Sequence, residues 1–309
     1  MFRRSTVLLV LLALLLIPTI ATVSAQSDSG ISVTCPNGRE ITNGVEVIVN
    51  MRPGFTYTAT ALGIDGFDPV IAVVDRGTVR DCVDDSQNAA EYAANLPSTG
   101  QISPSTRNVQ IPFAHSYSGF EDISVIVGGF NGQGGEFLLI LEGMSVTSAD
   151  GEGDPFVLRL TENMTQGRVN STVYMMTTND VLDPLLNLMV DGEVFQSCDD
   201  AGNENLCEGV STDLSGSVVS RTLGRETPPS NRNAMMELTT IGAAELDFSQ
   251  DWFYNFRMTS YQQSTFGDYI VAFHVAIGGE QPADAGDGST GGGSKDDSGG
   301  TKDESTLIP

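Results

Sequence analysis

The chain has 309 residues, of which 40 are acidic and 15 are basic, so its formal net charge is −25. A surface of this charge repels phosphate backbones and anionic lipid, which argues against nucleic acid or a membrane surface as a partner. The same charge suits solubility and suits a bound cation.

The first 25 residues have the pattern of an export signal. Arg3 and Arg4 precede an apolar run from Val7 to Ile17, and small residues lead up to Ala25. We therefore expect cleavage near Ala25 and a mature protein that is secreted or held in the cell envelope. The alternative is an uncleaved anchor, but the run is shorter than a membrane span needs. No second apolar run of that length follows, so the mature chain has no expected span.

Two stretches of the chain follow one pattern. Asp68-Pro69 and an apolar run recur as Asp183-Pro184 and an apolar run, followed in both copies by a glycine (Gly77, Gly192) and a double aspartate. This internal repeat predicts two similar domains, at 26–148 and 154–279. The segment between them is rich in Gly and Asp and is typical of a linker, so we expect each domain to pack its own core.

The repeats read as strands. Phe55, Tyr57, Ala59 and Ala61 alternate with threonines at 56, 58 and 60, which predicts a strand with one face in solvent. Further short runs of this kind, separated by Gly, Asn, Asp and Pro, are 45–49, 70–74, 109–113, 123–127, 137–141, 156–160, 173–177, 185–190, 235–239, 252–258 and 269–275. The fold class is therefore all-β, with two tandem antiparallel β-sandwiches. Residues 280–309 are rich in Gly, Ser and Asp and predict a disordered tail.

The repeated unit resembles the bacterial pre-peptidase C-terminal (PPC) domain, a jelly-roll-like β-sandwich. The resemblance rests on the Asp-Pro strand, the glycine turn, the double aspartate, and a closing strand that begins Gly135-Glu136-Phe137 in one copy and Gly267-Asp268-Tyr269 in the other. Domains of this family accompany secreted peptidases, and some related modules hold calcium near the double aspartate. No peptidase domain accompanies the two copies in this sequence.

The double aspartates are the candidate metal ligands. Asp84 and Asp85 in the first copy, and Asp199 and Asp200 in the second, offer hard carboxylate oxygens from short loops, which calcium prefers. Asp68 and Asp183 precede the strands that could face these loops. The alternative is that all of these residues form solvated turns, which Asp forms readily.

Four cysteines in an exported chain favour two disulfides over a zinc site. Cys198 and Cys207 bracket a short acidic stretch and are expected to pair, which leaves Cys35 for Cys82. Relative to the repeat, Cys82 and Cys198 are staggered by one residue. Because one residue along a strand reverses the face, we expect these two cysteines on different faces.

Catalytic patterns are sparse. The two histidines, His115 and His274, occupy non-equivalent positions, and no metalloprotease, serine hydrolase or phosphate-loop motif occurs. The alternation around His274 predicts a solvent-facing or mixed-face side chain. Arg221, Arg225 and Arg232 lie close together in the extra segment of the second copy and are candidate binding residues. Their alternative role is to neutralise nearby acids.

The sequence therefore predicts an exported, non-catalytic binding or scaffolding protein whose partner is an extracellular protein or a glycan. The rival hypothesis is a secreted hydrolase, or a hydrolase accessory module, that acts on polysaccharide or peptide. A deep cleft with converging carboxylates would favour the rival.

Overall fold

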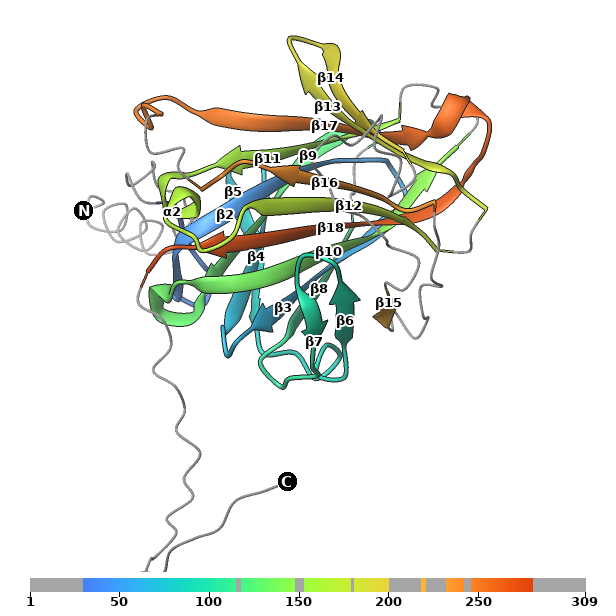
Figure 1. The fold of residues 1–309 in the computed structure, drawn as a ribbon. Helices are drawn as coiled ribbons and strands as arrows, with labels where there is room; N and C mark the ends of the chain where they lie inside the picture. The colour runs from blue at the N-terminus through green and yellow to red at the C-terminus, as the bar shows by residue number, and fades with distance from the viewer. Residues whose placement is uncertain are drawn as a thin grey trace, which may run out of the picture.

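The computed structural model describes residues 30–114, 118–147, 153–178, 181–199, 218–220, 232–241 and 246–279. This part of the chain is nearly all β-strand, and every strand pairing in it is antiparallel (Figure 1). The predicted fold class is confirmed. No helix in the described part is long and apolar enough to cross a membrane.

The first repeat contributes ten strands and a short 3-10 helix. They are β1 (Ile31–Thr34), β2 (Glu40–Met51), β3 (Thr56–Ile64), β4 (Pro69–Asp75), β5 (Thr78–Asp84), β6 (Ala93–Leu96), β7 (Gly100–Ile102), β8 (Val109–Ala114), β9 (Glu121–Gly129), η1 (Phe130–Gly132) and β10 (Gly135–Val146).

The elements of the second repeat follow in a similar order along the chain. Its elements are β11 (Asp154–Leu160), α2 (Glu162–Thr165), β12 (Ser171–Thr177), β13 (Pro184–Val190), β14 (Glu193–Cys198), β15 (Val218–Ser220), β16 (Ala234–Leu238), β17 (Trp252–Ser260), η3 (Tyr261–Gln263) and β18 (Gly267–Ile277).

The two repeats share both sheets of the sandwich. One sheet has the order β14-β13-β17-β11-β2-β9-β4-β5, with β1 added on β2, and the other has the order β16-β12-β18-β10-β3-β8. The joint lies between β11 and β2 in the first sheet and between β18 and β10 in the second. Outward from the joint, the first sheet runs β2-β9-β4-β5 on one side and β11-β17-β13-β14 on the other. The second sheet runs β10-β3-β8 on one side and β18-β12-β16 on the other. Equivalent strands of the two repeats therefore follow in the same order. The repeats are therefore related by an approximate two-fold axis at the joint.

The hydrophobic core is continuous across this joint. One cluster of buried side chains runs from Val47 on β2 and Leu139 on β10 to Phe256 on β17 and Phe273 on β18. The expectation that each repeat packs a core of its own is therefore wrong. The reason is that β2 and β11, and β10 and β18, satisfy each other's backbone groups, so neither repeat ends at an exposed edge at the joint.

A third layer covers the outer surface of the six-stranded sheet. The small sheet β15-β6-β7 lies there, and a second apolar cluster joins Leu96 and Ile102 to Leu138 and Tyr174. The Tyr174 hydroxyl donates to Ser98 Oγ at 2.7 Å, which ties this layer to the second repeat. On the threonine face of β3, expected in solvent, Thr56 is exposed but Thr58 and Thr60 are buried, and Thr60 Oγ1 accepts a hydrogen bond from Gln110 Nε2 at 3.0 Å.

The repeated glycine marks a hairpin turn in both halves. Arg76 and Gly77 join β4 to β5 with φ of 50° and 72°, and Asp191 and Gly192 join β13 to β14 with φ of 51° and 82°. Two successive positive φ angles are the signature of the type I′ turn, whose twist matches that of paired strands. This turn fixes the register of the strands that carry the double aspartates.

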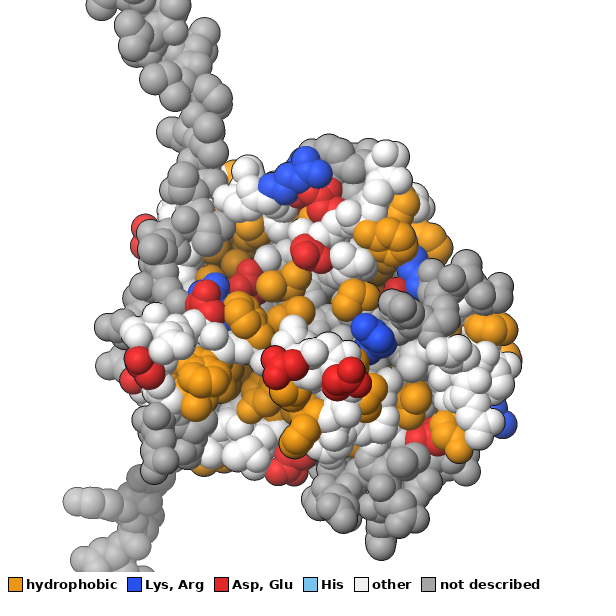
Figure 2. All heavy atoms as spheres, turned by 90° about the horizontal axis from the view of Figure 1, so that it is seen from above, with side chains coloured by type: hydrophobic (Ala, Val, Ile, Leu, Met, Phe, Trp, Pro, Cys, Tyr) orange, Lys and Arg blue, Asp and Glu red, His pale blue; other side chains and the backbone are white. Residues whose placement is uncertain are grey.

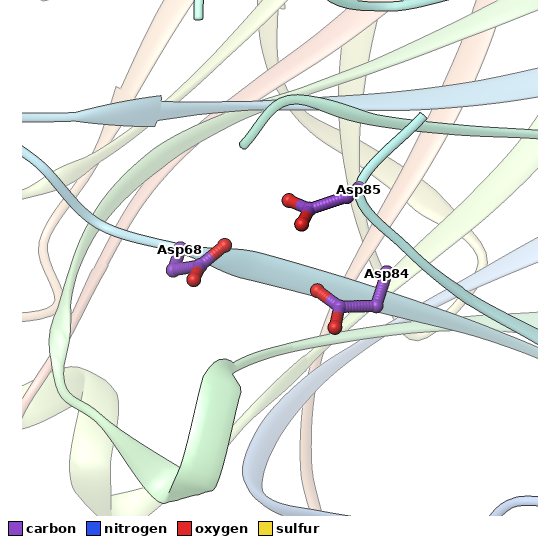
Figure 3. Close-up of side chains that lie close together, drawn as sticks. All are labelled: Asp68, Asp84 and Asp85. Carbon is purple, nitrogen blue, oxygen red and sulfur yellow. The ribbon is translucent and has the colours of Figure 1, made fainter. Parts of the chain in front are cut away.

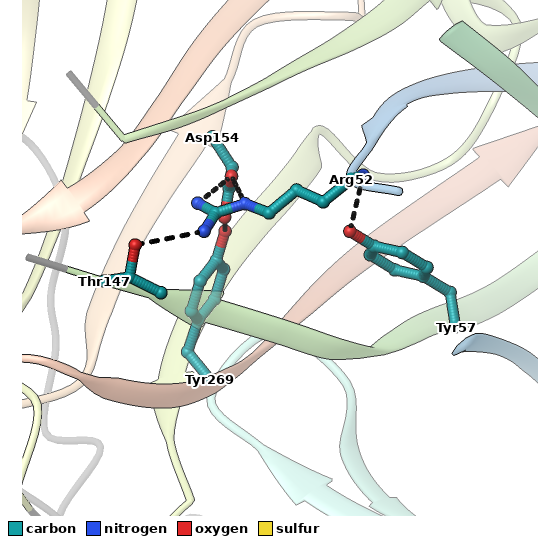
Figure 4. Close-up of polar contacts among 5 residues, drawn as sticks. All are labelled: Arg52, Tyr57, Thr147, Asp154 and Tyr269. Carbon is teal, nitrogen blue, oxygen red and sulfur yellow. Dashed lines mark hydrogen bonds and ion pairs between the residues drawn. The ribbon is translucent and has the colours of Figure 1, made fainter. Parts of the chain in front are cut away.

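A buried polar network lies at the joint (Figure 4). Arg52 follows β2 and donates from Nε to Asp154 Oδ1, at the start of β11, at 2.9 Å. The Tyr269 hydroxyl of β18 donates to the other oxygen of Asp154, and the Tyr57 hydroxyl accepts from the backbone of Arg52 at 3.1 Å. Residues from both repeats and both sheets therefore meet in one network.

Candidate functional site

Three carboxylates converge in the first repeat. Asp68 precedes β4, Asp84 ends β5, and Asp85 follows in a left-handed conformation with φ of 47°. One oxygen from each lies within 4.8 Å of the others, and the three side chains point toward one another (Figure 3). The prediction that Asp68 faces the double aspartate is confirmed. We call Asp68, Asp84 and Asp85 the acidic triad.

The pairing of β4 and β5 builds the triad. Val70 lies opposite Asp84, so the first residues of β4 and the last residues of β5 share one end of the sheet. Asp68 is held in place through its backbone carbonyl, which accepts from Phe130 N of η1 at 2.8 Å.

The electrostatics of the triad favour a bound cation. Burial raises the pKa of the Asp68 carboxyl, and the charges of Asp85 and Asp84 raise it further, while Arg107 and Arg39 act in the opposite direction. Oδ1 of Asp68 and Oδ1 of Asp84 are buried without a hydrogen-bond partner in the described part of the chain. Arg39 forms an ion pair with the other oxygen of Asp84. The triad therefore holds more negative charge, and more acceptor capacity, than its neighbours satisfy.

These residues fit calcium. Calcium takes six to eight oxygen ligands in flexible geometry, and carboxylates bind it through one or both oxygens. Asp68, Asp84 and Asp85 could supply part of such a shell, with water completing it. A hollow of about 230 Å³, lined in part by Asn37, Arg39 and Asp84, lies beside the triad.

The corresponding position in the second repeat is only partly described. Asp183 is held as Asp68 is, because its carbonyl accepts from Tyr261 N of η3 at 2.8 Å. Asp199 is described and its side chain is buried. Asp200 lies outside the described residues, so the second predicted calcium loop stays a prediction.

The cysteines follow the predicted stagger. Cys35 and Cys82 form a disulfide, as predicted. Cys82 lies opposite Ala72 and packs, partly buried, against the apolar cluster on the outer surface of the sheet, to which Ala72 belongs. Cys198 lies opposite Leu186 in the main core and is also disulfide-bonded. Cys207, its expected partner, lies outside the described residues.

The predicted arginine group is mostly outside the described part. Arg221 and Arg225 lie outside it, whereas Arg232 is described two residues before β16 and is partly buried. The structure therefore does not bring these three residues together within the part that it describes.

His274 is buried rather than solvent-facing. It is on the face of β18 opposite Tyr269, Val271 and Phe273, as the alternation predicts, but its exposed fraction is 0%. Its Nε2 lies 2.7 Å from Glu136 Oε1 on the neighbouring strand β10. The prediction failed because the strand pattern carries no information about the layers above this sheet. His115 lies outside the described residues.

The outer surface of the second repeat holds a candidate site that was not predicted from the sequence. A hollow of about 490 Å³ is lined by Leu185, Asn187, Val194, Ser197, Arg257, Thr259, Ser260, Gln262 and Gln263. We call these nine residues the open face. They belong to β13, β14, β17 and η3. The view from above these strands shows hydrophobic side chains gathered among separate acidic and basic ones (Figure 2).

The matching surface of the first repeat is closed. There, β1 and the residues around Cys35 cover β4, β5 and β9, and Val70, Ala72, Val79 and Ile126 are buried. The Cys35–Cys82 disulfide fastens this cover to β5. The sequence does indicate the open face. When the repeats are aligned at Asp68 and Asp183, the polar residues Asn187 and Ser197 take the positions of Ala72 and Cys82.

Comparison with protein-family models and with curated proteins finds no match to this chain. The resemblance to the PPC domain therefore rests on the residue pattern alone.

Proposed function

We propose that this chain is an exported, non-catalytic binding or scaffolding protein of the cell envelope or extracellular space, built from two PPC-like modules. The observation that carries the proposal is the difference between the two outer surfaces. The first is closed by a disulfide-fastened segment, whereas the second presents a hollow of about 490 Å³. Binding sites on rigid sandwich scaffolds are commonly concave surfaces with a few convergent polar groups.

The disulfide supports export. Structural disulfides form and persist in oxidising compartments and are rare in the cytosol. Cys35, directly after β1, is bonded to Cys82 of β5, so the link fastens this peripheral strand to the sheet. The export signal predicted in residues 1–25, which lies outside the described residues, agrees with this compartment.

The acidic triad supports a structural calcium ion in the first repeat. A bound ion would remove the repulsion among Asp68, Asp84 and Asp85 and would satisfy their buried oxygens. Extracellular modules bind calcium with dissociation constants of about 10⁻⁴ to 10⁻³ M, which extracellular calcium can saturate. The ion would fix the end of β4 and β5 and take no part in a reaction.

The lining of the open face supports binding over hydrolysis. Acid–base hydrolysis of glycosides needs two carboxyl groups that flank the bond, and peptide hydrolysis needs a nucleophile with its base or a metal-bound water. The nine residues that line the hollow include no carboxylate, histidine or cysteine.

Co-sedimentation separates the two hypotheses. The mature chain, with calcium, is incubated with bacterial envelope and extracellular-matrix fractions, and the pellet and the released products are measured. A binding protein enters the pellet and releases neither reducing sugar nor peptide amines. Release of either product that increases with time and with protein concentration would establish the hydrolase instead, and absence from every pellet would refute the binding role.

A further inference from the structure

The open face differs from its counterpart in three aligned positions. In the first repeat, Ala72 lies opposite both Cys82 and Ile126; Ala72 and Ile126 belong to the covered apolar cluster, and the partly buried Cys82 packs against it. In the second repeat, Asn187 occupies the same place and lies opposite both Ser197 and Arg257. Ile126 and Arg257 are equivalent because each lies four residues before the 3-10 helix that holds the aspartate carbonyl.

The three neighbouring residues Ser197, Asn187 and Arg257 therefore form a polar row across β14, β13 and β17, and part of it is pre-ordered. Ser197 Oγ donates to Asn187 Oδ1, and Asn187 is 5% exposed, so its amide is fixed in one orientation. Arg257 lies beside it on β17, where Phe256 and Met258 point into the core. No ion pair of Arg257 occurs among the described residues. Its side chain lines the hollow, and a guanidinium carries five N–H donors.

The chemistry of the lining is that of neutral hydrogen bonding. Asn187, Gln262 and Gln263 carry amides, and Ser197, Ser260 and Thr259 carry hydroxyls. Amides and hydroxyls both donate and accept, which matches a ligand whose groups do both, as the hydroxyls of a sugar do. Leu185 and Val194 add apolar surface at the same hollow, which suits the C–H faces of a sugar ring.

The charge of the chain selects against acidic ligands. The net charge of −25 repels a polyanion over the Debye length, and one arginine in the hollow offsets little of that field. A polycation would find no carboxylate in the lining. An uncharged ligand is not repelled by the net charge and needs no carboxylate in the lining.

We propose that the open face binds an uncharged oligosaccharide, with Asn187 and Arg257 as the central hydrogen-bonding residues. The inference rests on the proposed binding function and names the ligand class of its surface. Phe253 lies on the same side of β17 four residues before Arg257, about 13 Å away at the rise of a strand, and is 44% exposed. Arg159 of β11 lies over its ring at 5.9 Å. A ligand that contacts both Arg257 and Phe253 must therefore span several sugar units.

Isothermal titration calorimetry on the full mature chain tests the proposal. The probes are cellohexaose, xylohexaose, mannohexaose, maltohexaose and chitohexaose, with hexagalacturonate as the acidic comparison, and the matching disaccharides test length. We expect at least one neutral hexasaccharide to bind at least tenfold more tightly than its disaccharide and more tightly than hexagalacturonate.

Substitutions locate the site. Asn187→Ala and Arg257→Ile install the residues found at the equivalent positions of the first repeat, and each should weaken binding at least tenfold. Arg257→Gln replaces the guanidinium with a neutral polar amide. Because this side chain is only partly buried, the variant should still fold. Arg76→Gln, at the β4–β5 turn, is the matched control and should bind as the unmodified chain does. Melting curves confirm that each variant is folded.

Two treatments of the co-sedimenting fraction distinguish the inference from the function on which it rests. Periodate oxidation of the fraction should abolish sedimentation of the chain, whereas protease treatment should leave it unchanged. The reverse result would overturn the oligosaccharide and leave a protein-binding module. Binding of no neutral probe, of hexagalacturonate alone, or of a probe equally by folded Arg257→Gln and the unmodified chain would also overturn it.

Discussion

Arg52, directly after β2, and Asp154, at the start of β11, form a buried ion pair that joins the two repeats. Both side chains are less than a tenth exposed, and Tyr269 and Thr147 complete the network around them. Burial and the Asp154 carboxylate together raise the pKa of the Tyr269 phenol well above its ordinary value, so this hydroxyl remains a donor at physiological pH.

Asp154→Asn should destabilise the protein by about 3–5 kcal/mol, because it leaves the Arg52 charge buried without its carboxylate. Chemical denaturation measures this free energy. Asp251→Asn is the matched control, since Asp251 pairs with Arg159 at the surface and should cost no more than about 1 kcal/mol. Equal losses in the two variants would show that the joint does not depend on this ion pair.

The shared core predicts that the two repeats unfold together. Calorimetry should show one transition whose calorimetric and van 't Hoff enthalpies agree, because β2–β11 and β10–β18 are internal strand pairs. A fragment ending at residue 147 should fail to fold, since it exposes the edges of β2 and β10 and half of the core. A fragment that unfolds cooperatively by itself would contradict the continuous core.

Calcium should stabilise the protein through the acidic triad. At ten times the dissociation constant the gain is about 1.4 kcal/mol, or a few degrees in the melting temperature. Asp68→Asn and Asp84→Asn should reduce this gain, whereas Asp81→Asn, an exposed neighbour outside the triad, should leave it intact. Melting curves in calcium and in chelator decide the matter, and identical shifts in all variants would place the ion elsewhere.

The triad also predicts a pH dependence in chelator. The folded pKa of Asp68 is raised, so the folded state binds the proton more tightly than the unfolded chain does. The stability that this proton adds is present at low pH and is lost as the pH rises from the unfolded value near 3.8 through the folded pKa. Asp68→Asn should abolish this loss. Denaturation measured between pH 3 and pH 7 checks it, and an unchanged slope in the variant would exclude Asp68 as the source.

Non-reducing peptide mapping should show the Cys35–Cys82 link and a second link between Cys198 and Cys207. The chain-entropy model gives about 4 kcal/mol for the first link, with its separation of 47 residues. Cys35→Ser with Cys82→Ser should destabilise the protein and free the segment around Cys35 from β5, and faster amide exchange in residues 31–34 would report it. A free thiol at Cys207 would contradict the second pairing.

The sequence predicts the local features of this fold well. Alternation identifies β3, the repeated glycine identifies the two hairpin turns, and the one-residue stagger correctly puts Cys82 and Cys198 on opposite faces. These features depend on neighbours within one strand or one hairpin. The fused core could not be predicted, because a strand at an exposed edge and one paired across the joint, such as β10 with β18, carry the same pattern. The third layer was hidden for the same reason, so Thr60 and His274 were expected in solvent.

In the candidate sites, too, features within one hairpin could be predicted from the sequence, whereas features that depend on distant segments could not. The convergence of Asp68 on Asp84 and Asp85 follows from hairpin register, which the repeat fixes. The open face depends on the absence, within the described residues, of a segment like the one that covers the first repeat. The segment that covers the first repeat lies before β2, whereas only residues 147–153 separate β10 from β11, too few to repeat that cover. Comparing Ala72 with Asn187 in the two repeats could have found the face from the sequence.

The binding surface is expected on the second repeat and not on the first. Amide hydrogen–deuterium exchange on the mature chain, with and without the tightest-binding hexasaccharide, tests it most directly. Residues 184–198 and 252–263 should exchange more slowly with the ligand, and exchange in residues 69–84 and 121–129 should be unchanged. Protection of the first-repeat strands alone, or equal protection of both sets, would contradict it.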